Sequence, residues 1–289
     1  MRPDAGLLQK LGRAHFVVDG QSGRVGSGQR RSAEKGPGIE FVDHRPYEPG
    51  DDLRYLDVNQ YALRGEFMVR QYVVERALPV TILLDATDSM DYGTPGKFEY
   101  ARTLCEVLAF VGLSGGDVVQ LAAWQDNRLR RSPRAQGRGA AERLFGWLEP
   151  AQCRGRSFDR ALRQVDRLLD SNGLVIVVSD WWDDAALRAA IALCARRHVL
   201  AVQVLSPEEL EPSFGDNAAL QLIDSENEQA IELTVDAGAL DSYRRAVVEW
   251  RQDMRREFLR AGARFATVRT DESIERALLV DWHRHRIIA

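Results

Sequence analysis

Short apolar segments alternate with amphipathic segments from Pro79 to the end of this chain. Val80–Leu84 and Leu174–Ser179 are almost wholly apolar, as is typical of strands that are buried on both faces of a sheet. Lys97–Leu113 has apolar residues at helical spacing, which indicates an amphipathic helix. Strands that alternate with helices predict an α/β fold, in which a doubly wound, mostly parallel sheet carries helices on both faces.

The same reasoning gives the other elements. Strands are expected at 118–124, 199–205 and 265–268, and helices at 140–148, 158–169, 185–197 and 273–280. A turn at Gln125–Asn127 is expected to start a short hairpin, and segments 220–223 and 230–235 are expected to form an inserted hairpin. Asp241 or Ser242 is expected to cap a long helix that ends at Gly262.

The first 78 residues differ from the rest in composition. Residues 20–38 hold six glycines among arginines and serines, which is typical of a loop. A turn is expected at Pro46–Asp52 and a strand at Phe67–Val74. We therefore expect two parts, an N-terminal extension over residues 1–78 and an α/β domain over residues 79–289.

Composition narrows the class of protein. The chain has 289 residues, of which 45% are hydrophobic, and a formal net charge of −4. A chain of this size can bury a substantial core, and its near-neutral charge argues against nucleic acid as a partner of the whole protein. No apolar run approaches the roughly 18–20 residues of a membrane-spanning helix, and no signal-peptide pattern is present. We expect a cytoplasmic protein without a transmembrane segment.

Aspartates follow both of the most apolar strands. Asp85 comes directly after the first, with Thr87 and Ser89 at alternate positions, and Asp180 comes after the second. Ligands of open parallel sheets bind at the carboxyl ends of the strands, so we expect these residues to meet there, together with Ser157. Carboxylate and hydroxyl oxygens without histidine or cysteine are ligands that a hard cation such as Mg²⁺ or Mn²⁺ selects. Helix capping and turn formation are the alternative roles for the same residues.

These residues resemble a known metal site. The pattern Asp85-x-Thr87-x-Ser89, followed at a distance by Ser157 and Asp180, is similar to the metal-ion-dependent adhesion site of von Willebrand factor A domains. That site usually has serine where this chain has Thr87 and threonine where it has Ser157, so a hydroxyl is kept at both positions. The resemblance implies that these five residues hold one Mg²⁺ or Mn²⁺ ion, with water or a partner's carboxylate in the remaining positions.

The N-terminal part carries a second resemblance, to the bacterial family called domain of unknown function 58. Its signature resembles the segments Gly38–Phe41, Arg45–Tyr47, Pro49–Asp52, Arg54, Leu56–Asp57, Val69–Arg70 and Glu75–Arg76. Similar features follow at Asp224–Glu226, Tyr243 and Thr267–Thr270. The candidate partner-binding residues within this signature are Arg45, Asp51, Asp52, Arg54 and Asp57. Val58 and Leu63 depart from the family, which usually has tryptophan and arginine there.

This resemblance implies a non-enzymatic protein-interaction module. Such proteins are associated with MoxR-type AAA+ ATPases and help other complexes to assemble or mature, so we expect such an ATPase and a client protein with an acidic side chain as partners. A magnesium-dependent phosphoester hydrolase is the enzymatic alternative, although the phosphate-loop-like string Gly93–Lys97 lacks its first glycine. A metal-free structural adaptor is the other alternative. His283 and His285 are expected to lie in a disordered tail.

Overall fold

The computed structural model describes residues 2–18, 30–32, 40–169, 173–212, 218–223, 230–235 and 237–289. The chain divides into two units: unit 1 consists of Met1–Val17 and Leu78–Ala289, and unit 2 consists of Val18–Ala77. The expected glycine-rich loop lies mostly outside the described residues, and the family-like segment Asp224–Glu226 lies wholly outside them.

Unit 1 is built around a sheet that has seven strands among the described residues. These are β4 (Pro79–Asp85), β5 (Val118–Gln125), β6 (Arg128–Arg131), β7 (Ala135–Gln136), β8 (Leu174–Ser179), β9 (His198–Leu205) and β12 (Arg264–Arg269). They lie in the order β12-β9-β8-β4-β5-β6, and β7 also pairs with β5. Neighbouring strands from β12 to β5 are parallel, whereas β6 and β7 are antiparallel to β5. The prediction of a mostly parallel sheet is therefore confirmed, as is the hairpin that starts after β5.

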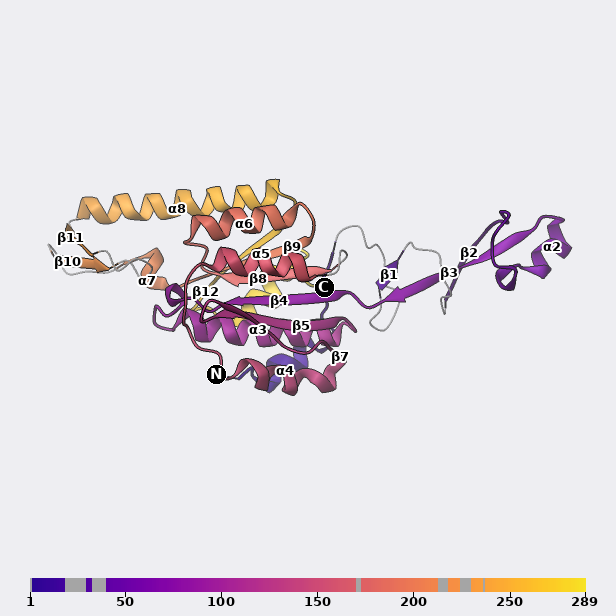
Figure 1. Ribbon diagram of the computed structural model, residues 1–289, viewed down its shortest axis with the longest axis horizontal. Coiled ribbons are helices and arrows are strands. Elements are labelled where there is room, and N and C mark those ends of the chain that lie inside the picture. The colour runs from indigo at the N-terminus through magenta and orange to yellow at the C-terminus, as the bar shows by residue number, and fades with distance from the viewer. Residues whose placement is uncertain are drawn as a thin grey trace. The chain divides into compact units, whose positions relative to one another are not determined.

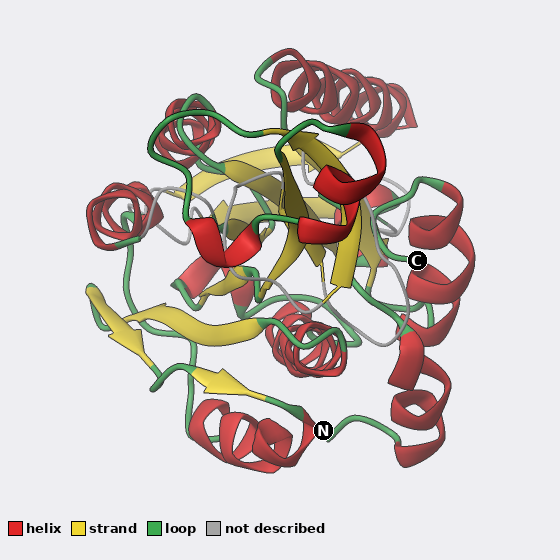
Figure 2. Ribbon diagram, turned by 90° about the vertical axis from the view of Figure 1, so that its right-hand side faces the viewer, coloured by secondary structure: helices red, strands yellow, loops and turns green. Residues whose placement is uncertain are grey.

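Helices cover both faces of this sheet. On one face lie α3 (Lys97–Ser114) and α4 (Ala141–Leu148), and on the other lie α5 (Phe158–Leu168), α6 (Asp184–Cys194) and α8 (Ala237–Arg260) (Figure 1). Figure 2 shows the sheet from its end, with helices around it. The shorter helical segments of unit 1 are α1 (Ala5–Lys10), η1 (Leu11–Arg13), η3 (Asp88–Met90), η4 (Arg138–Ala140), α7 (Pro207–Leu210), α9 (Ile274–Arg276) and η5 (Ala277–Trp282).

The start of α8 differs from the prediction. The helix begins at Ala237, and the Ser242 hydroxyl donates a hydrogen bond to the Gly238 carbonyl 2.9 Å away, inside the first turns. Neither Asp241 nor Ser242 is therefore the cap. Gly262 ends the helix with a φ of +79°, in the left-handed conformation that favours glycine, as expected. The predicted hairpin before α8 is confirmed: β10 (Ala218–Ile223) pairs antiparallel with β11 (Ala230–Val235).

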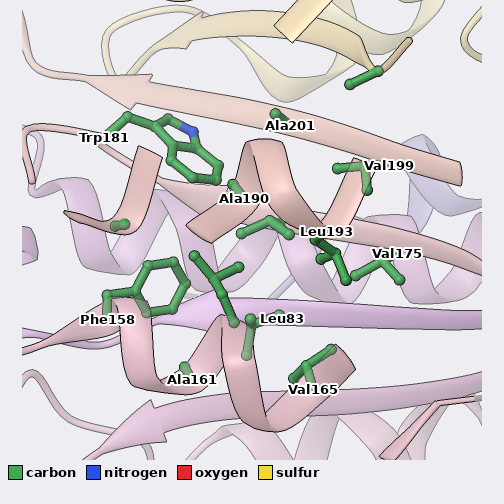
Figure 3. Packing of buried hydrophobic residues seen from close by; sticks show 14 of the residues in the cluster. Leu83, Phe158, Ala161, Val165, Val175, Trp181, Ala190, Leu193, Val199 and Ala201 are labelled. Atoms are coloured by element: carbon green, nitrogen blue, oxygen red, sulfur yellow. The ribbon is translucent and has the colours of Figure 1, made fainter. Parts of the chain in front are cut away.

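One part of the core lies between the sheet and the group formed by α5, α6 and α8. Apolar side chains of β4 and β8, including Leu83, point into this layer (Figure 3). Trp181 is 1% exposed and packs edge-on against Phe158 and Phe258, with ring centroids 6.4 Å and 5.0 Å apart. Its indole Nε1 donates to the Val202 carbonyl at 3.1 Å. The end of β8 is thus fixed by buried Trp181, which directly follows Asp180.

The two ends of the described chain pack together in unit 1. Phe16 forms an antiparallel bridge with Ile288, and Leu11, Phe16 and Ile288 are all buried. Two expectations need correction for this reason. The extension over residues 1–78 is wrong at its start, because residues 2–17 belong to unit 1. The segment that holds His283 and His285 is not a disordered tail, because apolar burial directly after it fixes the chain.

Unit 2 contains a three-stranded antiparallel sheet in the order β1-β3-β2. Its elements are β1 (Arg30–Ser32), β2 (Glu40–Pro46), η2 (Leu53–Tyr55), α2 (Val58–Arg64) and β3 (Met68–Arg76). Asp57 caps α2 by accepting hydrogen bonds from the backbone of Asn59 and Gln60. Gly65 ends the same helix with a φ of +74°. The connection between β2 and β3 therefore contains a seven-residue helix, α2, whose beginning and end are both defined.

Candidate functional site

The candidate site is positioned by two neighbouring strands that run in the same direction. β4 and β8 are adjacent, with Leu84 opposite Val178. Asp85 and Ser179 therefore stand at the same edge of the sheet, and Asp180 directly follows. Both strands are buried along their lengths, so the polar residues begin where the apolar layers end. The prediction that Asp85 and Asp180 meet at one edge agrees with this geometry.

Both carboxylate oxygens of Asp85 accept hydrogen bonds. Oδ1 accepts from the backbone N–H of Thr87 at 3.0 Å and from the Thr87 hydroxyl at 2.7 Å. Oδ2 accepts from the Ser179 hydroxyl at 2.7 Å. The Thr87 hydroxyl oxygen also lies 3.1 Å from that of Ser89. Asp85, Thr87 and Ser89 thus form a continuous row of oxygen atoms.

Helix capping does not account for these hydroxyls. Thr87 stands before η3 and Ser157 before α5, yet within the described residues neither side chain makes a capping hydrogen bond. Asp183, by contrast, caps α6 by accepting from Ala185 N at 2.7 Å. The capping alternative is therefore wrong for Thr87 and Ser157, although the backbone bond from Thr87 to Asp85 is typical of a turn.

Backbone contacts bring the Ser157 segment to the same edge. Arg154 N donates to the Ala86 carbonyl at 2.8 Å, and Asp88 N donates to the Gly155 carbonyl at 3.0 Å. Gly155 has a φ of +110°, and a Cβ atom there would come within 2.9 Å of a backbone nitrogen, so the close approach requires glycine. Ser157 itself has a φ of +60°. The loop before Ser157 is thus tied to the Asp85 loop, while its hydroxyl is not part of the row of oxygen atoms.

The two aspartates create an excess of negative charge in a buried place. Asp85 and Asp180 are each 2% exposed. Burial, followed by the nearby charge of Asp180, raises the pKa of Asp85 to about 7, although hydrogen bonds from Ser179 and Thr87 act in the opposite direction. A site with this property is stabilised by an added positive charge.

A buried lysine supplies part of that charge. The Lys97 ammonium is 2.7 Å from Asp180 Oδ2 and 2.6 Å from Glu209 Oε1, and the residue is 1% exposed. Burial acts to lower the pKa of Lys97, but the two carboxylates outweigh it, so that the pKa is raised. Neither Lys97 nor Glu209 was expected at this site from the sequence. Two signals in the sequence could have indicated them. Lys97 is a cation in the first turn of a predicted helix, where it opposes the helix dipole. Ser206-x-x-Glu209 has the spacing of a capping box.

Glu209 connects this ion pair to aromatic residues. Its Oε1 also accepts a hydrogen bond from the Trp182 indole at 2.8 Å, and its carbonyl accepts from the Tyr243 hydroxyl at 2.8 Å. Trp182 stacks on Trp250 with ring centroids 3.9 Å apart. Glu209 Oε2 accepts from Ser206 N at 2.8 Å, which completes the capping box of α7. The Lys97–Glu209 pair is thus held from several sides.

The donor set fits a hard divalent cation in part. Carboxylate and hydroxyl oxygens suit Mg²⁺, which takes about six oxygen ligands and usually retains several waters. No group of three or more His, Cys, Asp or Glu side chains in the described part of the chain is arranged to hold a metal ion. An ion here would therefore depend on the hydroxyls of Thr87, Ser89 and Ser157, with water or a partner's oxygen, besides Asp85 and Asp180.

The five candidate partner-binding residues of unit 2 form local pairs. Arg45 and Asp51 make a bidentate ion pair and are each about one-fifth exposed. Arg54 pairs with Asp52, with Nη2 2.6 Å from Oδ2. Asp57 accepts from Arg70 at 2.8 Å and contacts His44 at 2.7 Å. These contacts, Arg70 first, lower the pKa of Asp57 well below its ordinary value. The pairs account for local structure around α2.

Exposed apolar side chains also lie on and next to α2. Val58 and Leu63 are 68% and 80% exposed, and Leu53 is 68% exposed. Phe67 is half exposed and stacks on Tyr61 with ring centroids 4.3 Å apart. The two departures from the family pattern therefore change exposed positions instead of the core of unit 2.

Residues 43–254 match the family described as "Protein of unknown function DUF58". The chain belongs to the DUF58 family. It is 30% identical to uncharacterized protein Rv1480 of Mycobacterium tuberculosis over 248 residues. The matched region covers 82% of this chain and 76% of that protein. Uncharacterized protein Mb1516 of Mycobacterium bovis matches with the same identity and coverage. Uncharacterized protein MAV169 of Mycobacterium avium is 34% identical over 113 residues, which are 38% of this chain and 63% of that protein.

Solved structures also resemble this DUF58 chain. BatB from Bacteroides thetaiotaomicron gives a TM-score of 0.45 at 18% identity and covers 70% of this chain and 95% of its own. An aerotolerance-related membrane protein from Bacteroides fragilis gives a TM-score of 0.45 at 15% identity, with 73% and 98% covered. Among the residues that the structure describes, no helix has the length and apolar character needed to cross a membrane.

Proposed function

We propose that this DUF58 protein is a non-enzymatic interaction module of von Willebrand factor A-like architecture that binds partners through a Mg²⁺ or Mn²⁺ ion. The observation that carries the proposal is the row of oxygen atoms formed by Asp85, Thr87 and Ser89 beside Asp180 at one strand edge. Ser157 approaches the same edge through its loop. Asp85, Thr87, Ser89, Ser157 and Asp180 would hold the ion, which supplies positive charge and an open position.

A partner carboxylate would complete this site. The excess negative charge at Asp85 and Asp180 favours a divalent cation, and a cation with an incomplete shell attracts an Asp or Glu side chain. The client would therefore offer an acidic residue. A MoxR-type AAA+ ATPase is the proposed second partner, in the assembly or maturation of other protein complexes; the family resemblance supports this part.

Thermal unfolding with added metal tests the site. Ligand at about 100 times its Kd stabilises a protein by about 2.7 kcal/mol, which corresponds to about 5–10 °C in Tm for a domain of this size. We expect MgCl₂ or MnCl₂ to raise the Tm of the wild type, but not that of Asp85→Asn. Asp183→Asn is the matched control, because it removes a carboxylate at the same edge that caps α6. Equal shifts in all three proteins would refute the metal site.

Partner binding needs its own measurement. The purified protein is mixed with the MoxR-type ATPases of its source organism, with Mg²⁺ or with EDTA. We expect a complex that EDTA and Asp85→Asn both weaken, while Asp183→Asn does not. A complex that forms equally well in every case would contradict metal-dependent binding.

A metal-free adaptor is the second candidate, and Lys97 favours it. Its ammonium already pairs with Asp180, so that part of the negative charge is balanced by the protein. This alternative expects partner binding that is insensitive to EDTA, together with no metal-dependent rise in Tm.

A further inference from the structure

Four buried charged groups meet beside the candidate cation site. The carboxylates of Asp85, Asp180 and Glu209 and the ammonium of Lys97 belong to residues that are at most 9% exposed. With all four ionised, three negative charges face one positive charge, which leaves a net charge of minus two. One divalent cation is therefore the charge that makes this cluster neutral. Burial makes the balance important, because solvent screens charges poorly there.

Lys97 also restricts how Asp180 can contribute. The ammonium holds Asp180 Oδ2 at 2.7 Å, while Oδ1 receives the backbone N–H of Trp182 at 3.3 Å. A second cation at Oδ2 would face the lysine charge directly. Oδ1 is therefore the oxygen that remains for an added cation.

We propose that Lys97 sets the affinity and charge selectivity of the cation site, by cancelling one of three buried carboxylate charges. This inference rests on the proposed function, since it concerns the same ion. Glu209 is the counterpart of Lys97 in this role. Its carboxylate contacts the lysine ammonium at 2.6 Å and adds one negative charge to the cluster.

A charge series tests the proposal. Lys97→Met removes the positive charge, so that the net charge of the cluster becomes minus three. Glu209→Gln removes one negative charge, so that the net charge becomes minus one. The double variant has the wild-type net charge of minus two. Mn²⁺ binding is measured by electron paramagnetic resonance of the free ion. We expect Kd to fall about tenfold in Lys97→Met, to rise about tenfold in Glu209→Gln, and to lie within about threefold of the wild type in the double variant; tenfold corresponds to about 1.4 kcal/mol. Circular dichroism confirms that each variant is folded.

Controls separate this proposal from the proposed function. Asp85→Asn should abolish binding in the wild-type and Lys97→Met backgrounds, which places the ion at the site, and Asp183→Asn should leave Kd within about threefold. If Lys97→Met does not fold, Glu209→Gln and the double variant still give two points of the series.

Each outcome decides something. In the first outcome, the wild type binds Mn²⁺ through Asp85, but Kd is unchanged across the variants or changes in the opposite order. This result would overturn the role of Lys97 and leave the proposed function standing. A wild type that does not bind, with Lys97→Met that does, would support the role of Lys97 and overturn the proposed function. No Asp85-dependent binding in any of the proteins would overturn both.

Discussion

Glu106 lies on α3, is 2% exposed, and has a carboxylate oxygen, Oε2, that makes no hydrogen bond within the described residues. Burial raises its pKa from an ordinary value of 4.5 to about 7, and the positive charges of Arg102 and Arg2 offset only part of this rise. The folded protein therefore binds a proton here between about pH 4.5 and 7, where the unfolded chain has released it. Stability should decrease as the pH rises through this window.

The size of the effect follows from the two pKa values. A rise from 4.5 to about 7 corresponds to about 3 kcal/mol, which is an upper figure for the loss at pH 8. Glu106→Gln keeps the size of the side chain and removes the ionisable group. We expect the variant and the wild type to have similar free energies of unfolding at pH 4. At pH 8 the variant should be more stable by up to about 3 kcal/mol.

Urea unfolding followed by tryptophan fluorescence at several pH values measures this difference directly. Other titrating groups contribute equally to both proteins, so the difference between their curves isolates Glu106. Glu99→Gln is the matched control on the same helix, because the Glu99 side chain is 55% exposed and pairs with Arg102. A constant separation between the wild type and Glu106→Gln from pH 4 to pH 8 would refute a raised pKa.

Three further predictions concern the region next to the site and the surface of unit 2. Gly93→Ala should lower the free energy of unfolding by at least about 1 kcal/mol, because Gly93 has a φ of +88° and its new Cβ would lie 2.4 Å from that of Ser206; chemical denaturation measures it. Leu63→Ser should change that free energy by no more than about 0.5 kcal/mol, since Leu63 is 80% exposed. Arg45→Ala should also lower the free energy of unfolding, because Asp51 loses its bidentate partner. If Leu63→Ser lowered this free energy more than Arg45→Ala does, the ion pair would not be the more important contact.

The central sheet could be predicted from the sequence because its signals are local. The strand expected at Val80–Leu84 extends by one residue at each end, and the strand at Leu174–Ser179 was predicted with the correct bounds. Each is almost wholly apolar, so burial on both faces is visible in the residues themselves. The start of α8 was missed because Asp241 and Ser242 have good capping side chains that the helix places inside its own turns.

The candidate site was predictable only in part. Asp85 and Asp180 could be placed at one edge because each directly follows a buried strand. Lys97 and Glu209 could not be paired, since they lie 112 positions apart and their meeting depends on how α7 packs beside α3. The burial of Phe16 against Ile288 was hidden for the same reason, because no local pattern marks a contact between distant segments.

That last contact determines when unit 1 can be completed during synthesis. Phe16 leaves the ribosome well before its partner Ile288. Residues 18–77 meanwhile find their described strand partners among themselves. Translation should therefore allow these strands to pair before the bridge that joins Phe16 to Ile288 can form.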